Sequence, residues 1–156
     1  MDLRRCAAFL AWAEAALADL PNVRHLQNTY DLASYAAHDV GEAMLGAYGY
    51  RTRHGSGQHD ALGRCLAAVF DTPPENAASR HFEQMRRDCN RQRYHAWPSR
   101  TVAAAAILAA AVDLHRAGTT CVRRGPAAVP EQCPSPSGTR KGLLVRAGTA
   151  NGLENR

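Results

Sequence analysis

Apolar residues recur at every third or fourth position through most of the first 117 residues, which is the spacing of one buried helix face. The first segment shows this pattern in Leu3, Cys6, Leu10, Ala13, Leu17 and Leu20. Five helices are predicted in this way, over residues 2–20, from 26 or 28 to 48, 58–70, 77–97 and 100–116. Asp2 and Ser99 are suitable N-caps, while Gly49 and Gly118 follow helices in the position of a stop.

The sequence changes character between and after these helices. Residues 50–57 (Tyr-Arg-Thr-Arg-His-Gly-Ser-Gly) are polar and contain glycine, which predicts a loop. From Gly118 onward the chain contains four Pro and six Gly, a composition that cannot bury enough surface to offset chain entropy. The prediction is an all-α fold, an up-down bundle of four to five helices over residues 1–117. A disordered, flexible, basic, Pro/Gly-rich tail is predicted over residues 118–156, in which residues 142–145 could still pair weakly with another segment.

Composition agrees with one helical domain. A chain of 156 residues with 46% hydrophobic content is long enough for a single core, and its abundance of alanine favours helices. The formal charge of +5 is unevenly placed, because residues 1–117 contain 13 Arg against 12 acidic residues, whereas residues 118–156 contain six basic and two acidic residues. The net charge therefore does not by itself indicate nucleic-acid binding by the folded part.

Cysteine usage and hydropathy indicate the compartment. The five cysteines are an odd number without a Cys-x-x-Cys pair, and no signal peptide is recognisable before them. No apolar run reaches the roughly 18–20 residues that a membrane-spanning helix needs. A cytoplasmic protein without a membrane partner is expected.

The segment 86–95 carries the most specific chemistry, since it holds four arginines, an asparagine, a tyrosine and a histidine within three helical turns. Residues four apart share a helix face, so Arg87, Arg91 and His95 form one cationic stripe with Asn90 and Tyr94 beside it. Such a stripe could bind a phosphodiester, and His95 could carry a proton near neutral pH. The alternative is a solvated helix face that keeps a small bundle soluble.

Other common chemistries are disfavoured. The sequence has no dinucleotide-binding glycine motif, Walker loop or Gly-x-Ser-x-Gly elbow. His25 or His38 could complete a cation site with His54 and His59. These two lie in a glycine loop and at a helix start, and no Cys pair or carboxylate stands at ligand spacing, so surface histidines are favoured over a zinc site. Cys89 shares a stripe with Phe82 and Met85 and is predicted to be a buried apolar residue, not a nucleophile. No metal or cofactor is expected.

Several motifs together resemble the HEPN superfamily. They are Tyr30-Asp31-Leu32-Ala33-Ser34-Tyr35-Ala36-Ala37-His38, Gly41-Glu42-Ala43-Met44-Leu45, Gly49-Tyr50-Arg51, and Asn90-x-x-x-Tyr94-His95 before Pro98. The likeness is greatest to the small HEPN domains typical of actinobacteria, and it covers residues 1–117. It implies a helical bundle that forms homodimers, with the motif of each subunit in a shared cleft.

The resemblance also implies an activity. Many HEPN proteins are metal-independent endoribonucleases that use an arginine, a polar residue and a histidine to activate a ribose 2′-hydroxyl. Cys89 stands where that pattern places its arginine, so Arg87 or Arg91 would have to take the role. The residues assigned to catalysis are His95, Arg91, Arg87 and Asn90, and those assigned to RNA binding are Arg86, Arg93, Tyr94, Arg51 and Arg53.

Three functions are open at this point. The first is a HEPN ribonuclease, such as a toxin restrained by a nucleotidyltransferase antitoxin. The second is a catalytically degenerate HEPN domain that binds RNA, a nucleotide or a protein. The third is an interaction bundle whose arginines only solvate a helix. RNA and a second copy of the chain are the expected partners.

Overall fold

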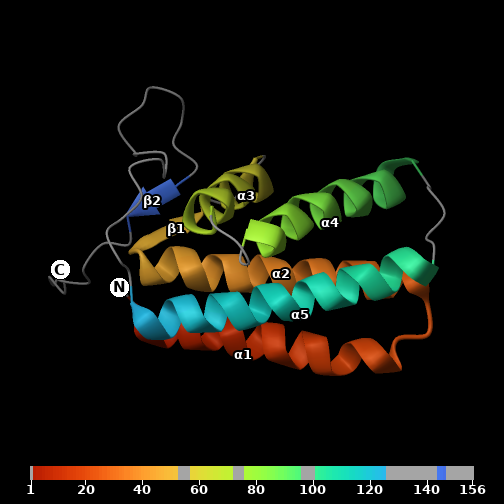
Figure 1. Cartoon of the computed structure of the whole chain (residues 1–156), viewed down its shortest axis with the longest axis horizontal. Coiled ribbons are helices and arrows are strands. Elements are labelled where there is room, and N and C mark those ends of the chain that lie inside the picture. The colour runs from red at the N-terminus through yellow and green to blue at the C-terminus, as the bar shows by residue number, and fades with distance from the viewer. Residues whose placement is uncertain (1, 53–56, 72–75, 96–100, 126–143, 147–156) are drawn as a thin grey trace, which may run out of the picture.

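A computed structural model of the chain describes residues 2–52, 57–71, 76–95, 101–125 and 144–146. Within these ranges, side chains are described except those of residues 77, 78, 81, 89, 92–95, 101–108 and 144–146. The elements are α1 (Leu3–Asp19), the short 3-10 helix η1 (Leu20–Asn22), α2 (Leu26–Ala47), β1 (Tyr50–Thr52), α3 (Gln58–Val69), α4 (Asn76–His95), α5 (Thr101–Arg124) and β2 (Leu144–Arg146). The predicted all-α fold is confirmed, and Figure 1 shows its arrangement.

Helix α2 occupies the centre of the bundle. Helices α1 and α5 lie along it, and α4 lies on the other side of α2 and α5 from α1 (Figure 1). The shorter α3 packs against α2 and α4 near the end where α2 leads into β1. The carboxyl end of α2 is almost entirely buried, because every residue from Val40 to Ala47 lies inside.

Most predicted helix ends are confirmed, and the caps explain them. Asp2 caps α1, since its Oδ1 accepts a hydrogen bond of 3.1 Å from the backbone N–H of Arg5. Helix α2 stops before Gly49, whose φ of 79° is the left-handed conformation that glycine tolerates best. Residues 96–100, which include the predicted cap Ser99, lie outside the described residues.

The predicted end of the last helix is wrong. Helix α5 continues past Gly118 as far as Arg124, and the residue with positive φ that follows it is Gly125. Gly118 serves packing instead of termination, because a Cβ added there would lie 2.3 Å from Cγ1 of Val40 on α2. Glycine at this position lets α5 approach α2 closely, and the contacts between the helices outweigh the weak helix preference of glycine.

The predicted loop over residues 50–57 is also wrong in its first part. Residues 50–52 form β1, which pairs with β2 in an antiparallel ladder that places Arg51 opposite Val145 and Thr52 opposite Leu144. Tyrosine and threonine suit a half-buried strand, and the pairing partner comes from almost 100 residues further along the chain. Residues 53–56, and the tail residues 126–143 and 147–156, lie outside the described residues.

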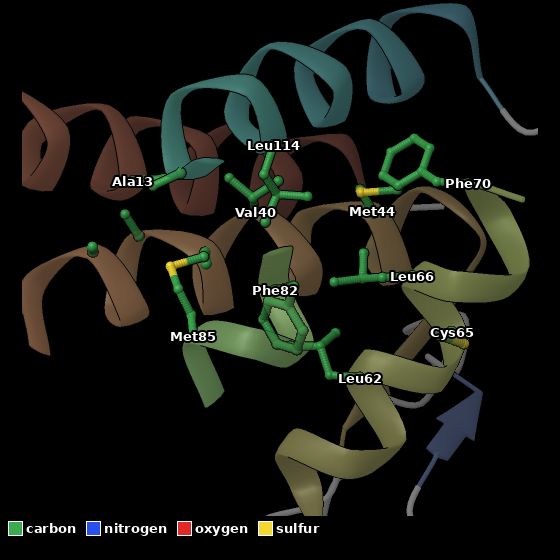
Figure 2. Close-up of a cluster of buried hydrophobic side chains, with 14 of the residues drawn as sticks. Ala13, Val40, Met44, Leu62, Cys65, Leu66, Phe70, Phe82, Met85 and Leu114 are labelled. Atoms are coloured by element: carbon green, nitrogen blue, oxygen red, sulfur yellow. The ribbon is translucent and has the colours of Figure 1, made fainter. Parts of the chain in front are cut away.

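The core joins all the helices around α2. Its largest fully buried side chains are Met44, Leu62, Leu66, Met85, Leu114 and Val40. Figure 2 shows side chains from α3, α4 and α5 converging on Val40 and Met44 of α2. A second, smaller cluster of Cys6, Ala43 and Ala47 joins α1 to α2. Burial of this surface is what fixes α4 in place and determines which of its faces is left outside.

In the described parts of the chain, no helix is both long and apolar enough to cross a membrane.

Candidate functional site

Helix α4 separates its buried and exposed residues as the sequence predicts. Ser79, Phe82 and Met85 are buried, and Phe82 and Met85 belong to the core. Arg80, Gln84, Arg87 and Arg91 recur at spacings of four, three and four on the opposite side and are exposed. The helix therefore carries a polar surface that faces away from α2.

Glu83 is the residue that organises the arginines of this helix. Its carboxylate accepts two hydrogen bonds from Arg86, of 2.8 Å from Nε and 2.7 Å from Nη2, and one of 3.0 Å from Nε of Arg87. These hydrogen bonds from Arg86, together with the one from Arg87, lower the pKa of Glu83 to about 2. The same ion pair raises the pKa of Arg86. Two of the three guanidinium nitrogens of Arg86, Nε and Nη2, are thus held by Glu83.

Arg87, Asn90 and Arg91 remain as the outward residues, and we call them the α4 arginine face. The side chain of Arg87 is 61% exposed although one of its nitrogens bonds to Glu83. Asn90 and Arg91 are exposed. Asp88 is engaged by Gln84, whose Nε2 donates to both carboxylate oxygens at 3.0 Å. Among the side chains that the structure describes, no carboxylate forms an ion pair with Arg91.

The remaining residues that were predicted to form the site either lie outside the described side chains or lie on another surface. Arg93, Tyr94 and His95 belong to the last turn of α4, but their side chains lie outside the described residues, as does all of Arg53. Arg51 is exposed on β1. Because β1 and the carboxyl end of α4 lie at opposite ends of the bundle (Figure 1), Arg51 is not part of the same surface.

A partly buried polar network that joins the carboxyl-terminal half of α2 to β1 and α3 was not predicted from the sequence. Glu42 is only 4% exposed, and the hydroxyl of Thr52 on β1 donates to its Oε1. Nε2 of Gln58 on α3 lies 2.8 Å from the Thr52 hydroxyl and 3.3 Å from Nε2 of His38 on α2. The two hydrogens of one amide can serve both contacts when His38 is neutral and accepts at Nε2. The network ties β1 and the start of α3 to α2.

Burial shifts the pKa values of two residues that precede Glu42 in the sequence of α2. It lowers the pKa of His38, and the neighbouring His59 lowers it further while Glu42 opposes the shift. Burial also raises the pKa of Asp39 to about 6, with a further contribution from Glu42. Arg5 of α1 supplies a positive charge, with Nη2 3.9 Å from Oε2 of Glu42.

The network is better explained by packing than by metal binding. The rings of His38 and His59 meet edge to face with centroids 4.9 Å apart, while His54 lies outside the described residues. Within the described ranges, no group of three or more His, Cys, Asp or Glu residues is placed to hold a metal ion. The sequence contains one signal of this network, since Glu42 is the lone charged residue in the stretch Val-Gly-Glu-Ala-Met-Leu-Gly-Ala (40–47).

Family models, curated proteins and solved structures all gave no match to this chain. The resemblance to the HEPN superfamily therefore stays a prediction from the motifs alone.

Proposed function

We propose that the chain is a HEPN-like helical domain that binds RNA through the α4 arginine face. The observation that carries the proposal is the exposure of Arg87, Asn90 and Arg91 on one side of a helix whose other side is anchored in the core. An arginine guanidinium can hold a phosphate through two hydrogen bonds, and an asparagine amide can bond to a base edge or to the backbone. RNA, in preference to other polyanions, is favoured by the resemblance to the HEPN superfamily.

The charges support binding at one end of α4 more than at its middle. Glu83 neutralises much of the charge of Arg86 and shares Arg87, whereas Arg91 lies two turns further along the helix. An anionic strand would therefore be attracted to the carboxyl-terminal half of α4. A helix carboxyl end is itself partly negative, so the arginines there must supply the whole attraction.

Binding is proposed in preference to cleavage because of the residues on which each depends. Phosphate contacts need only exposed cations, and the described residues include them. In the pattern that the HEPN resemblance implies, cleavage needs an arginine directly before the polar residue Asn90, and Cys89 occupies that place. Cleavage is thus an outcome of the test and not part of the proposal.

The test measures RNA affinity of the full chain by fluorescence anisotropy in EDTA at several salt concentrations. The double variant Arg87→Gln/Arg91→Gln should lower the slope of log affinity against log salt by about 1.4, because each lost phosphate contact on a single strand contributes about 0.7. Arg123→Gln is the matched control, since Arg123 is an exposed arginine in the last turn of α5, at the other end of the bundle.

Two results would contradict the proposal. One is RNA affinity that the double variant and the control change equally. The other is cleavage of the RNA in EDTA by the wild-type chain that His95→Ala abolishes, which would make the domain a ribonuclease and not a binding module.

A further inference from the structure

The outward side of α1 carries an apolar centre between two opposite charges. Six exposed residues lie there within an arc of about 100° on a helix of 3.6 residues per turn, and we call them the α1 outer face. They are Arg4, Ala8, Ala11, Trp12, Ala15 and Asp19. Trp12 is 60% exposed, although tryptophan usually contributes to cores and to protein interfaces. Phe9 supports it from the side, with ring centroids 5.4 Å apart.

The packing contacts of α1 with other helices leave this face outside. Among the described elements, α1 contacts α2, η1 and α5. Its buried residues Cys6 and Ala13 point to the side opposite the α1 outer face. Trp12 and the alanines beside it form one continuous exposed apolar strip, and continuous apolar patches, unlike a single exposed ring, are typical of interaction surfaces.

The order of charges identifies this partner as a second copy of the same chain. When two such helices are placed antiparallel around a two-fold axis between residues 11 and 12, Arg4 lies opposite Asp19 of the other copy. Ala8 then lies opposite Ala15, and Ala11 opposite Trp12. Each large ring therefore meets a small residue, and each positive charge meets a negative one. We propose that the chain forms a homodimer through antiparallel packing of α1 against α1.

The position of the charges within α1 supports the proposal independently. A helix favours acidic residues in its first turn and basic residues in its last. Helix α1 has neither, and instead places Arg4 in its first turn and Asp19 at its last residue. Both charges are thus unfavourable for the isolated helix, whereas an antiparallel partner would place each beside an opposite charge.

This dimer differs from the one that the HEPN resemblance implies. Helices α1 and α4 lie on opposite sides of α2 and α5 (Figure 1), so pairing through α1 keeps the two α4 arginine faces apart on the outer sides. RNA binding and α1 pairing therefore depend on separate surfaces, and either can fail without the other.

The first test is sedimentation equilibrium of the full chain over a wide range of concentration. Wild type is expected to be dimeric, and Ala11→Glu should weaken the dimer by about a hundredfold, because two like charges would meet beside the two-fold axis. Ala7→Glu is the matched control, since Ala7 is exposed on the same helix but lies about 90° around it from the centre of the face. A monomeric wild type, or equal effects of the two variants, would overturn the proposal.

The second test establishes the antiparallel register. Arg4→Glu and Asp19→Lys should each weaken the dimer by about tenfold, whereas the double variant should restore it. Each change also places a favourable charge at its helix end, so weaker association cannot be ascribed to a less stable helix, and circular dichroism would confirm this. Failure of the double variant to restore association would refute the antiparallel arrangement.

Discussion

Glu83 should lower the RNA affinity of the chain because it occupies Arg86 and Arg87, and Glu83→Gln should therefore raise that affinity. The carboxylate accepts three hydrogen bonds of 2.7 to 3.0 Å from Arg86 and Arg87. Glutamine has nearly the same shape but no charge, so the substitution frees both guanidinium groups for phosphate. The RNA affinity of the variant should rise while its stability falls, a combination that general disruption of the helix would not give.

The size of the gain follows from counterion release. Arg87 already belongs to the α4 arginine face, so the substitution adds one phosphate contact, that of Arg86, which steepens the salt slope on single-stranded RNA by about 0.7 and corresponds to about fivefold in affinity at about 0.1 M salt. Asp88→Asn is the matched control, because it removes one negative charge from the same helix but Asp88 accepts its hydrogen bonds from Gln84. The control should therefore increase affinity by less.

The cost in stability can be bounded from the pKa of Glu83. A pKa lowered from 4.5 to about 2 would correspond to about 3 kcal/mol in a fully buried pair. The side chain of Glu83 is 34% exposed and that of Arg87 is 61% exposed, so solvent screening reduces the expected loss to about 1 kcal/mol. Because the folded pKa is depressed, this stabilisation is present above pH 4.5 and is lost as the pH falls towards 2.

The assay pairs anisotropy titrations of labelled RNA with urea unfolding at several pH values. Two results would contradict this role of Glu83: RNA binding by Glu83→Gln no tighter than that by Asp88→Asn, or a loss of stability in Glu83→Gln that persists undiminished near pH 2.

Three further predictions concern the fold. Gly118→Ala should cost about 1–2 kcal/mol of stability in urea unfolding, because its Cβ would lie 2.3 Å from a methyl group of α2. Gly63→Ala, whose Cβ would have its nearest contacts at 3.5 Å, should instead stabilise α3 by about 0.5–1 kcal/mol. The reverse order of stabilities would contradict the close approach of α5 to α2. Thr52→Val should cost about 1–3 kcal/mol because buried Glu42 loses a donor, and Thr52→Ser should keep most of the stability; equal losses would exclude the hydroxyl as the cause. Burial raises the pKa of Asp39 from 3.8 to about 6, so wild type should lose about 1 kcal/mol relative to Asp39→Asn, after allowance for partial exposure, as the pH rises from 4 to 7 in pH-dependent unfolding; a difference that does not change with pH would contradict the raised pKa.

The helices could be predicted because their signals are local. The spacing of apolar residues, the cap at Asp2 and the glycine at position 49 all act within a few residues, and each is found as expected. Gly118 misled the prediction because a glycine that ends a helix and one that admits a neighbouring helix look alike in sequence. Strand β1 was missed for a related reason, since its partner β2 is distant along the chain.

The exposure of the arginines in the candidate site could be predicted from the sequence, but their ion pairs with Glu83 could not. Periodicity placed Arg87 and Arg91 on the outer side of α4, where the structure has them. It did not predict the role of Glu83, because the hydrogen bonds of Glu83 with Arg86 and Arg87 depend on side-chain conformations that periodicity does not give. The network around Glu42 was missed because its members come from α2, β1 and α3, which only the folded chain brings together.

The most direct measurement of the central claim is the salt dependence of RNA binding by the full chain in EDTA, compared between wild type and Arg87→Gln/Arg91→Gln. Wild type should bind RNA, and the double variant should have a slope smaller by about 1.4. An absence of RNA binding at low salt, or an unchanged slope in the double variant, would contradict this claim.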